Sequence, residues 1–197
     1  PRDVAVTDTV RAFVALPIEG ALAQHCAEVS TALRLHPAAA RRGARWTRVD
    51  GLHATLRFLG EVPVHSLPGL ETAVEVAAAS MVRPELLAGP VTAVGGRRAR
   101  VIALELTSWP PLGPLLETLD HALERLGLRP EGRAFRLHVT LARLRRPGPL
   151  EDWLEGVTVS PAREVASEVV LFRSVLSPAG AVHTRLAAAP LGPLEPR

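Results

Sequence analysis

The stretch Leu52-His53-Ala54-Thr55-Leu56 occurs a second time in the chain, with one residue changed, as Leu137-His138-Val139-Thr140-Leu141. Each half of the 197-residue chain contains one copy. Side chains alternate between the two faces of a strand, so each copy places its histidine and threonine on one face and its apolar residues on the other. If the two copies pack with pseudo-twofold symmetry, four polar side chains converge on one cleft: those of His53, Thr55, His138 and Thr140.

The composition is that of an ordinary soluble globular protein, with 47% apolar and 22% charged residues. We expect residues 1–197 to form a single bilobal domain with a substantial core. All 23 basic residues are arginine, and the net charge is +3. This balance allows phosphate-bearing partners without requiring them. The arginine excess fits a compositional bias and a functional surface equally well.

The single cysteine, Cys26, excludes an internal disulfide and a metal site built from several cysteines. We expect it on the buried face of the first helix. No apolar run reaches the roughly 18 residues of a membrane span, and the first residues lack the pattern of a signal peptide. These features predict a cytoplasmic protein with no membrane partner, and nothing in the sequence indicates assembly beyond a monomer.

Apolar periodicity predicts an α+β fold in which both halves of the chain contain several strands and at least one long helix. Helices are expected over residues 18–35, 66–81 and 112–126, and strands over 11–16, 45–49, 52–59, 91–94, 101–106, 135–144, 164–176 and 181–186. The last two strands are expected to pair around a turn at 177–180. Residues 188–197 are expected to form a tail, and His25 is expected to be solvated.

The paired motifs suit acid–base catalysis better than metal binding, since neither contains Asp or Glu and the chain has no His-Glu-x-x-His pattern. An imidazole titrates near neutral pH, so one histidine can accept a proton while the other donates one. Threonine hydroxyls two residues away can donate hydrogen bonds to phosphoryl oxygens. A single His-x-Thr strand is most often a half-buried structural strand without a catalytic role. The presence of two copies predicts chemistry on a phosphodiester, without a metal or cofactor.

The chain resembles the two-histidine phosphoesterases, and within them the RNA 2′,3′-cyclic phosphodiesterases, also called bacterial and archaeal 2′–5′ RNA ligases. Residues 11–17 resemble the opening strand of that family, and residues 171–180 its last hairpin. The stretches from Leu52 to Glu61 and from His138 to Arg143 resemble its two motifs. The resemblance implies two pseudo-symmetric lobes, each an antiparallel sheet with helices packed outside, around a central V-shaped cleft.

The resemblance also implies hydrolysis of a 2′,3′-cyclic phosphate at an RNA 3′ end, leaving a 2′-phosphate, with RNA joining through a 2′–5′ linkage as a related reaction. By this analogy His138 activates water and His53 protonates the 3′ oxygen. Thr55 and Thr140 hold the phosphate oxygens. No nucleotide cofactor is needed.

Four further residues are candidates for substrate binding. Arg143 matches the second family motif, yet strict alternation points it away from the histidines, so a bend would have to bring it back. Alternation places Arg57, and also Arg136, on the histidine side, where they could contact RNA phosphates. Phe13 could stack on a base, with core packing as the equally strong alternative.

Two other functions are also compatible with the sequence. The same chemistry could act on a small cyclic nucleotide or on an ADP-ribose cyclic phosphate. The chain could also be a nucleotide- or RNA-binding module without turnover, although a pure binder needs no acid–base pair. Binding that weakens with salt and strengthens with oligonucleotide length would favour an RNA substrate.

Overall fold

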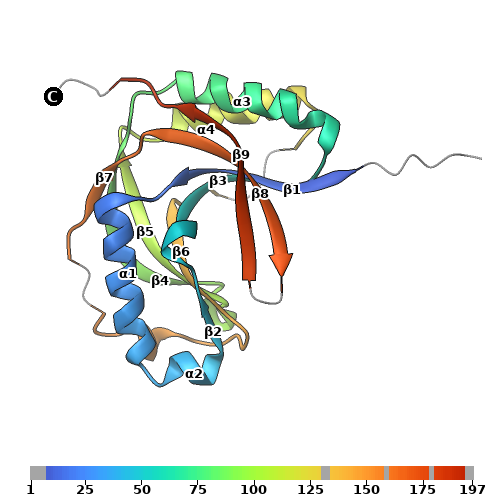
Figure 1. Ribbon diagram of the computed structural model, residues 1–197. Helices are drawn as coiled ribbons and strands as arrows, with labels where there is room; N and C mark the ends of the chain where they lie inside the picture. Colours follow the sequence, from blue (N-terminus) through green and yellow to red (C-terminus); the bar gives the residue numbers. More distant parts are fainter. Residues whose placement is uncertain (1–7, 130–133, 158–159, 178–179, 194–197) are drawn as a thin grey trace, which may run out of the picture.

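The computed structural model describes residues 8–129, 134–157, 160–177 and 180–193. These residues form one curled antiparallel sheet with helices outside the curl (Figure 1). The strand order is β7-β4-β5-β6-β3-β1-β8-β9, and β2 also pairs with β6. The strands are β1 (Thr9–Pro17), β2 (Ala44–Trp46), β3 (His53–Pro63), β4 (Glu85–Val94), β5 (Val101–Trp109), β6 (His138–Leu144), β7 (Arg163–Val165), β8 (Glu168–Ser177) and β9 (Gly180–Pro190).

The two motif strands are neighbours at the centre of this order. β3 and β6 pair antiparallel, with Ala54 opposite Val139. On one side of this junction β3 continues into β1, β8 and β9, and on the other β6 continues into β5, β4 and β7. The expected α+β fold with two lobes is therefore confirmed, and the lobes meet where the two motifs touch.

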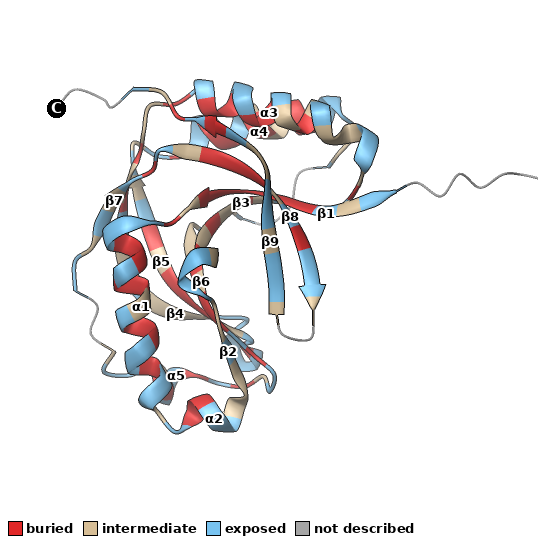
Figure 2. Cartoon of the chain, in the orientation of Figure 1, coloured by how far each residue is buried: buried red, intermediate tan, exposed pale blue. Residues whose placement is uncertain are grey.

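Helices cover the outer side of each lobe. α3 (Leu67–Ala79) and α4 (Gly113–Arg125) pack on each other, and α3 also packs on β8 and β9. α1 (Gly20–Leu35), followed by α2 (Ala38–Arg42), lies along the other lobe, where α5 (Glu151–Leu154) packs near β4. The helix faces toward the sheet are buried, whereas their outer faces are exposed (Figure 2). In the described part of the chain no helix is long and apolar enough to cross a membrane.

The core on the helix side explains the apolar half of each motif. Ala54 and Val139 are fully buried, and Leu56 and Leu141 are 2% exposed or less. Cys26 is also buried, as expected. Burial raises the pKa of its thiol to about 12, which leaves it protonated and unreactive at neutral pH.

The lobes are not consecutive halves of the chain. The N-terminal strands β1 and β3 share a lobe with the C-terminal hairpin β8–β9, while α1 packs against β7 in the other lobe. The strand expected over 164–176 is consequently two strands. β7 pairs with β4 and β8 pairs with β1, so the chain crosses from one lobe to the other between them.

The crossing brings a carboxylate to the start of α1. Glu19, the residue before the helix, makes no capping hydrogen bond through its side chain. Instead the Glu164 carboxylate in β7 accepts hydrogen bonds from the backbone N–H groups of Glu19 (3.0 Å) and Leu22 (3.3 Å). These donors have no partner within the helix. The long-range cap therefore ties α1 to the edge of the sheet.

Smaller differences concern the ends of elements. The strand expected at 45–49 ends at Trp46, and the one expected at 135–144 begins at His138. β9 continues to Pro190, into the expected tail, because residues 187–190 extend the ladder with β8. Short turns of 3₁₀ helix lie at Val49–Gly51, Val64–Ser66 and Gly96–Arg98. Residues 178–179 of the expected hairpin turn lie outside the described residues.

Candidate active site

The pairing of Ala54 with Val139 brings the four motif side chains together. In an antiparallel ladder the positions next to such a pair also face each other, so His53 lies across from Thr140 and Thr55 across from His138. All four side chains are half-buried and lie on the side of the sheet opposite the buried leucines. The convergence expected from the repeated motif is thus present in the geometry of the two strands.

Both histidines are held in the same way. The Nδ1 atom of His53 lies 2.8 Å from the Gly51 carbonyl oxygen, and that of His138 lies 2.7 Å from the Arg136 carbonyl oxygen. A carbonyl oxygen only accepts hydrogen bonds, so each Nδ1 carries a hydrogen and donates it. In the neutral ring Nε2 is then the free acceptor. Each histidine therefore has Nε2 available for proton transfer.

Aromatic rings surround His53. Its ring centroid lies 4.9 Å from that of Phe13, 6.1 Å from that of Phe172 and 5.1 Å from that of His183. Burial among these rings lowers the pKa of His53 to about 4, against the hydrogen bond to Gly51, and the charges of His183, Arg143 and His138 lower it further. His53 is therefore neutral at pH 7 in the substrate-free protein.

His183 is a third histidine at this site that the sequence analysis missed. It comes from β9, and its ring meets those of His53 and Phe13 edge-on. Burial lowers its pKa, and Arg143 lowers it further. No motif marks His183, because the pairing of β9 with β8 and of β8 with β1 is what brings it to β3.

A β-bulge in β3 changes the place of Arg57. Ala15 pairs with Thr55 and Val14 with Arg57, so Leu56 has no partner of its own in β1. Two consecutive residues consequently face the helices. Arg57 makes a bidentate ion pair with Asp120 of α4, with both N–O distances 2.6 Å. The expectation from strict alternation is wrong here, since the bulge turns Arg57 away from the histidines.

A β-bulge in β6 places Arg143 on the histidine side of the sheet. Ala103 pairs with Thr140 and Ile102 with Ala142, which leaves Leu141 without a partner in β5. Arg143 therefore lies on the same face as Thr140, and its charge acts on both His53 and His183. The bulge supplies the bend that the family resemblance requires if Arg143 is to face the histidines. It lies at Leu141, the last leucine of the second motif, as the bulge in β3 lies at Leu56 of the first.

Thr47 braces the second bulge. Its hydroxyl donates a 2.7 Å hydrogen bond to the Thr140 carbonyl oxygen, and its N–H donates a 2.9 Å bond to the Leu141 carbonyl oxygen. A bulge removes regular ladder partners from its strand. Thr47 supplies replacements, so the segment that follows β2 fixes the backbone that aims Arg143.

The bulge in β3 also determines which phenylalanine side chain is accessible on the histidine side. Phe13 is only 2% exposed and stacks on Phe172 with ring centroids 5.1 Å apart, so its role is packing. Phe58 occupies in the first motif the position that Arg143 occupies in the second. It pairs with Phe13 across the ladder and is 50% exposed. Phe58 is thus an accessible aromatic residue on the histidine side, where strict alternation from His53 would not place it.

Arg136 lies beside the second histidine but is already paired. Its guanidinium makes an ion pair with Glu105, and Glu105 lies directly across the β5–β6 ladder from His138. Among the described residues no group of three His, Cys, Asp or Glu side chains could hold a metal ion.

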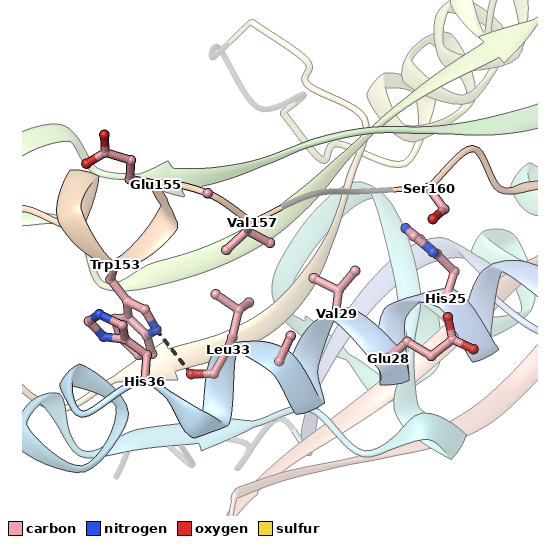
Figure 3. A pocket seen from close by; sticks show the side chains of 11 residues that line it. His25, Glu28, Val29, Leu33, His36, Trp153, Glu155, Val157 and Ser160 are labelled. Carbon is pink, nitrogen blue, oxygen red and sulfur yellow. Dashed lines mark hydrogen bonds between the residues drawn. The ribbon is translucent and has the colours of Figure 1, made fainter.

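A separate cavity of about 390 Å³ lies between α1 and the α5 region (Figure 3). Trp153 closes one end and donates a 3.1 Å hydrogen bond from Nε1 to the Leu33 carbonyl oxygen. His25 lines the cavity and is 6% exposed. Its expected solvation is wrong, because its side chain points into the cavity towards Ser160 (Figure 3). None of the four motif side chains lines this cavity.

The sequence that forms these strands and motifs matches a known family. The family described as "LigT like Phosphoesterase" matches residues 22–102 and 110–183. The chain belongs to this family. Both histidine motifs lie within the matched residues, as the resemblance of the sequence implied.

Relatives of this LigT-like phosphoesterase cover nearly its whole length. It is 29% identical over 182 residues to the RNA 2′,3′-cyclic phosphodiesterase of Methanothermobacter thermautotrophicus, across 89% of this chain and 95% of that protein. It is 26% identical to E. coli LigT in complex with 3′-AMP, with a TM-score of 0.63 and coverage of 94% and 99%. The protein TT0787 of Thermus thermophilus shares the fold, with a TM-score of 0.74 at 24% identity and coverage of 93% and 98%.

The lowered pKa of His53 predicts a pH-dependent contribution to stability. Between pH 6.5 and about 4 the unfolded chain binds a proton at this residue and the folded chain does not. The contribution of His53 to the free energy of unfolding is therefore fully present above pH 6.5. It is lost as the pH drops toward 4, by at most about 3 kcal/mol. Urea unfolding of wild type and His53→Gln across this range should show a shallower slope for the variant.

The exposed His65 offers a matched control for that experiment. His65→Gln should keep the wild-type pH slope. Identical slopes for wild type and His53→Gln would show that the aromatic surroundings do not hold His53 neutral.

The bulge in β3 predicts that Arg57 and Asp120 stabilise the fold as a pair. Removal of either partner leaves a half-buried charge unpaired, so Arg57→Ala and Asp120→Ala should each lower the free energy of unfolding by about 1–3 kcal/mol. The double variant should lose less than the sum, as a double-mutant cycle measures. The exposed Arg48–Asp50 pair, at 2.9 Å, should show much weaker coupling. Strict additivity for Arg57 and Asp120 would contradict the structural role.

Proposed function

We propose that this LigT-like phosphoesterase hydrolyses 2′,3′-cyclic phosphates at RNA 3′ ends and leaves a 2′-phosphate, without a metal ion. The observation that carries the proposal is the placement of two histidines and two threonines on one face of paired strands, with each Nδ1 bound to a carbonyl oxygen. The named activity of the relative from Methanothermobacter thermautotrophicus supports the same substrate class.

The reaction needs one proton removed and one supplied. A water molecule attacks phosphorus and loses a proton to the Nε2 of one histidine. The bond from phosphorus to O3′ breaks, and the other histidine protonates O3′. The hydroxyls of Thr55 and Thr140 donate hydrogen bonds to the non-bridging oxygens, on which negative charge accumulates in the transition state. A 5′-hydroxyl in place of water would give the 2′–5′ linkage.

The surroundings of His53 support its role as the base and that of His138 as the acid. His53 lies among aromatic rings and is neutral at pH 7, with Nε2 free to accept a proton. The reaction needs one base and one acid, so His138, the other motif histidine, takes the role of the acid. This assignment reverses the one that family resemblance implied.

An RNA hydrolysis assay tests the proposed activity. A short RNA ending in a 2′,3′-cyclic phosphate, incubated with the protein in EDTA, should yield only the 2′-phosphate. His53→Ala and His138→Ala should each lower kcat/KM by roughly 10²–10⁴-fold, the usual contribution of an acid or base. His121→Ala replaces an exposed histidine on α4 and should retain activity. Binding without ring opening by the wild type would exclude the proposed activity on RNA ends.

A second substrate in the same assay tests the acid and base assignment. An aryl phosphodiester with a good leaving group does not need its leaving oxygen protonated. His138→Ala should therefore recover most of its activity on this substrate, whereas His53→Ala should stay impaired. Recovery by His53→Ala instead would restore the assignment implied by the family resemblance.

A further inference from the structure

Arg45 stands beside Arg143 on the face that carries the histidines. In the ladder between β2 and β6, Arg45 pairs with Arg143 and Trp46 with Ala142. Directly paired residues share a face of the sheet. Trp46 packs toward the helix side, where its ring meets that of Trp153 edge-on at 6.3 Å. Arg45 therefore points to the other side, next to Arg143.

The guanidinium of Arg45 has no partner in the described part of the chain. Other arginines of the same region do have partners. Arg42 donates to the carbonyl oxygens of Pro147 and Pro149, each at 3.1 Å. Arg48 is paired with Asp50. Arg45 alone in this group of three is exposed and uncompensated.

Two like charges directly opposite each other destabilise an antiparallel ladder. Burial lowers the pKa of Arg143, and the positive charge of Arg11 in β1 lowers it further. None of these three arginines lies within ion-pair distance of a carboxylate among the described residues. An anion bound beside Arg45 and Arg143 would balance the positive charge that these residues and Arg11 bring to this face.

We propose that Arg45 and Arg143 bind a second phosphate of the substrate, the 5′-phosphate of the terminal nucleotide, which links it to the rest of the RNA chain. This inference rests on the proposed function and specifies its substrate. It makes Arg45 a binding residue that distinguishes an RNA end from a cyclic mononucleotide.

The spacing along β6 agrees with this assignment. Arg143 follows Thr140 by three positions, one of which is taken up by the bulge at Leu141. Two regular steps of roughly 3.3 Å each then separate the threonine from the arginine pair. This separation is comparable to that between neighbouring phosphates in an extended RNA strand. The bulge thus sets both the direction of Arg143 and the register of the second phosphate.

A binding experiment tests Arg45 independently of turnover. The ligands are a nucleoside 2′-phosphate, the same nucleotide with a 5′-phosphate, and a dinucleotide ending in a 2′-phosphate. Their Kd values are measured for the full chain as wild type, Arg45→Gln, Arg45→Lys and the control Arg48→Gln. Arg45 has no partner among the described residues, so its replacement should not disturb folding.

Arg45→Gln should weaken binding of both ligands that carry the 5′-phosphate by about tenfold, and binding of the plain nucleoside 2′-phosphate by less than about twofold. The slope of log Kd against log salt should fall by about one for the dinucleotide. Arg45→Lys should regain part of the affinity, and Arg48→Gln should match the wild type.

Equal losses for all three ligands, or no loss for any, would overturn the second phosphate site. A loss confined to the dinucleotide would also overturn it, because the contact would then be to the second nucleoside. The hydrolysis assay reports on the proposed function separately. A wild type that binds with this pattern but opens no ring keeps the phosphate site and excludes the RNA hydrolase.

Discussion

The contact between Ala54 and Val139 is the constraint on which the site depends. β3 and β6 belong to different lobes, and this pair is where the two lobes join in one sheet. Both side chains are fully buried, so the junction is part of the core. Because the flanking positions of an antiparallel pair also face each other, one backbone contact aligns both histidines with both threonines. The arrangement of the four motif side chains follows from the way the lobes are joined.

Two β-bulges then complete this arrangement. Each lies at the last leucine of a motif, Leu56 or Leu141, and each turns two consecutive residues toward the helices. In β3 the bulge places Arg57 against Asp120 and leaves Phe58 on the histidine side. In β6 it leaves Arg143 there. The repeat therefore supplies an exposed aromatic surface in one lobe and a guanidinium in the other.

The repeated motif was sufficient to predict the α+β class, the buried leucines and the convergence of His53 with His138. These follow from alternation within a strand and from duplication, both of which are local properties of the sequence. The places of Arg57 and Arg143 could not be obtained in this way, since a bulge depends on the pairing partner. A comparison of the two copies offers one signal: both carry a bulky residue five positions after the histidine, Phe58 and Arg143.

His183 and Arg45 were beyond sequence reasoning for a related cause. His183 reaches His53 only because the C-terminal hairpin joins the N-terminal strands, and Arg45 reaches Arg143 through a three-residue strand. Neither contact leaves a periodic pattern. Likewise, Glu164 caps the start of α1 although it lies 145 residues after Glu19 in the sequence. Long-range topology, rather than local propensity, determines these neighbours.

A crystal structure of the protein with a bound nucleoside 2′-phosphate would show whether the joined strands form the site. Phosphorus should lie between the Nε2 atoms of His53 and His138, with its oxygens accepting hydrogen bonds from Thr55 and Thr140. Arg143 should face the nucleotide while Arg57 stays on Asp120. A phosphate bound by only one of the two histidines, or by Arg57 in place of Arg143, would contradict the joined-strand geometry as the basis of the site.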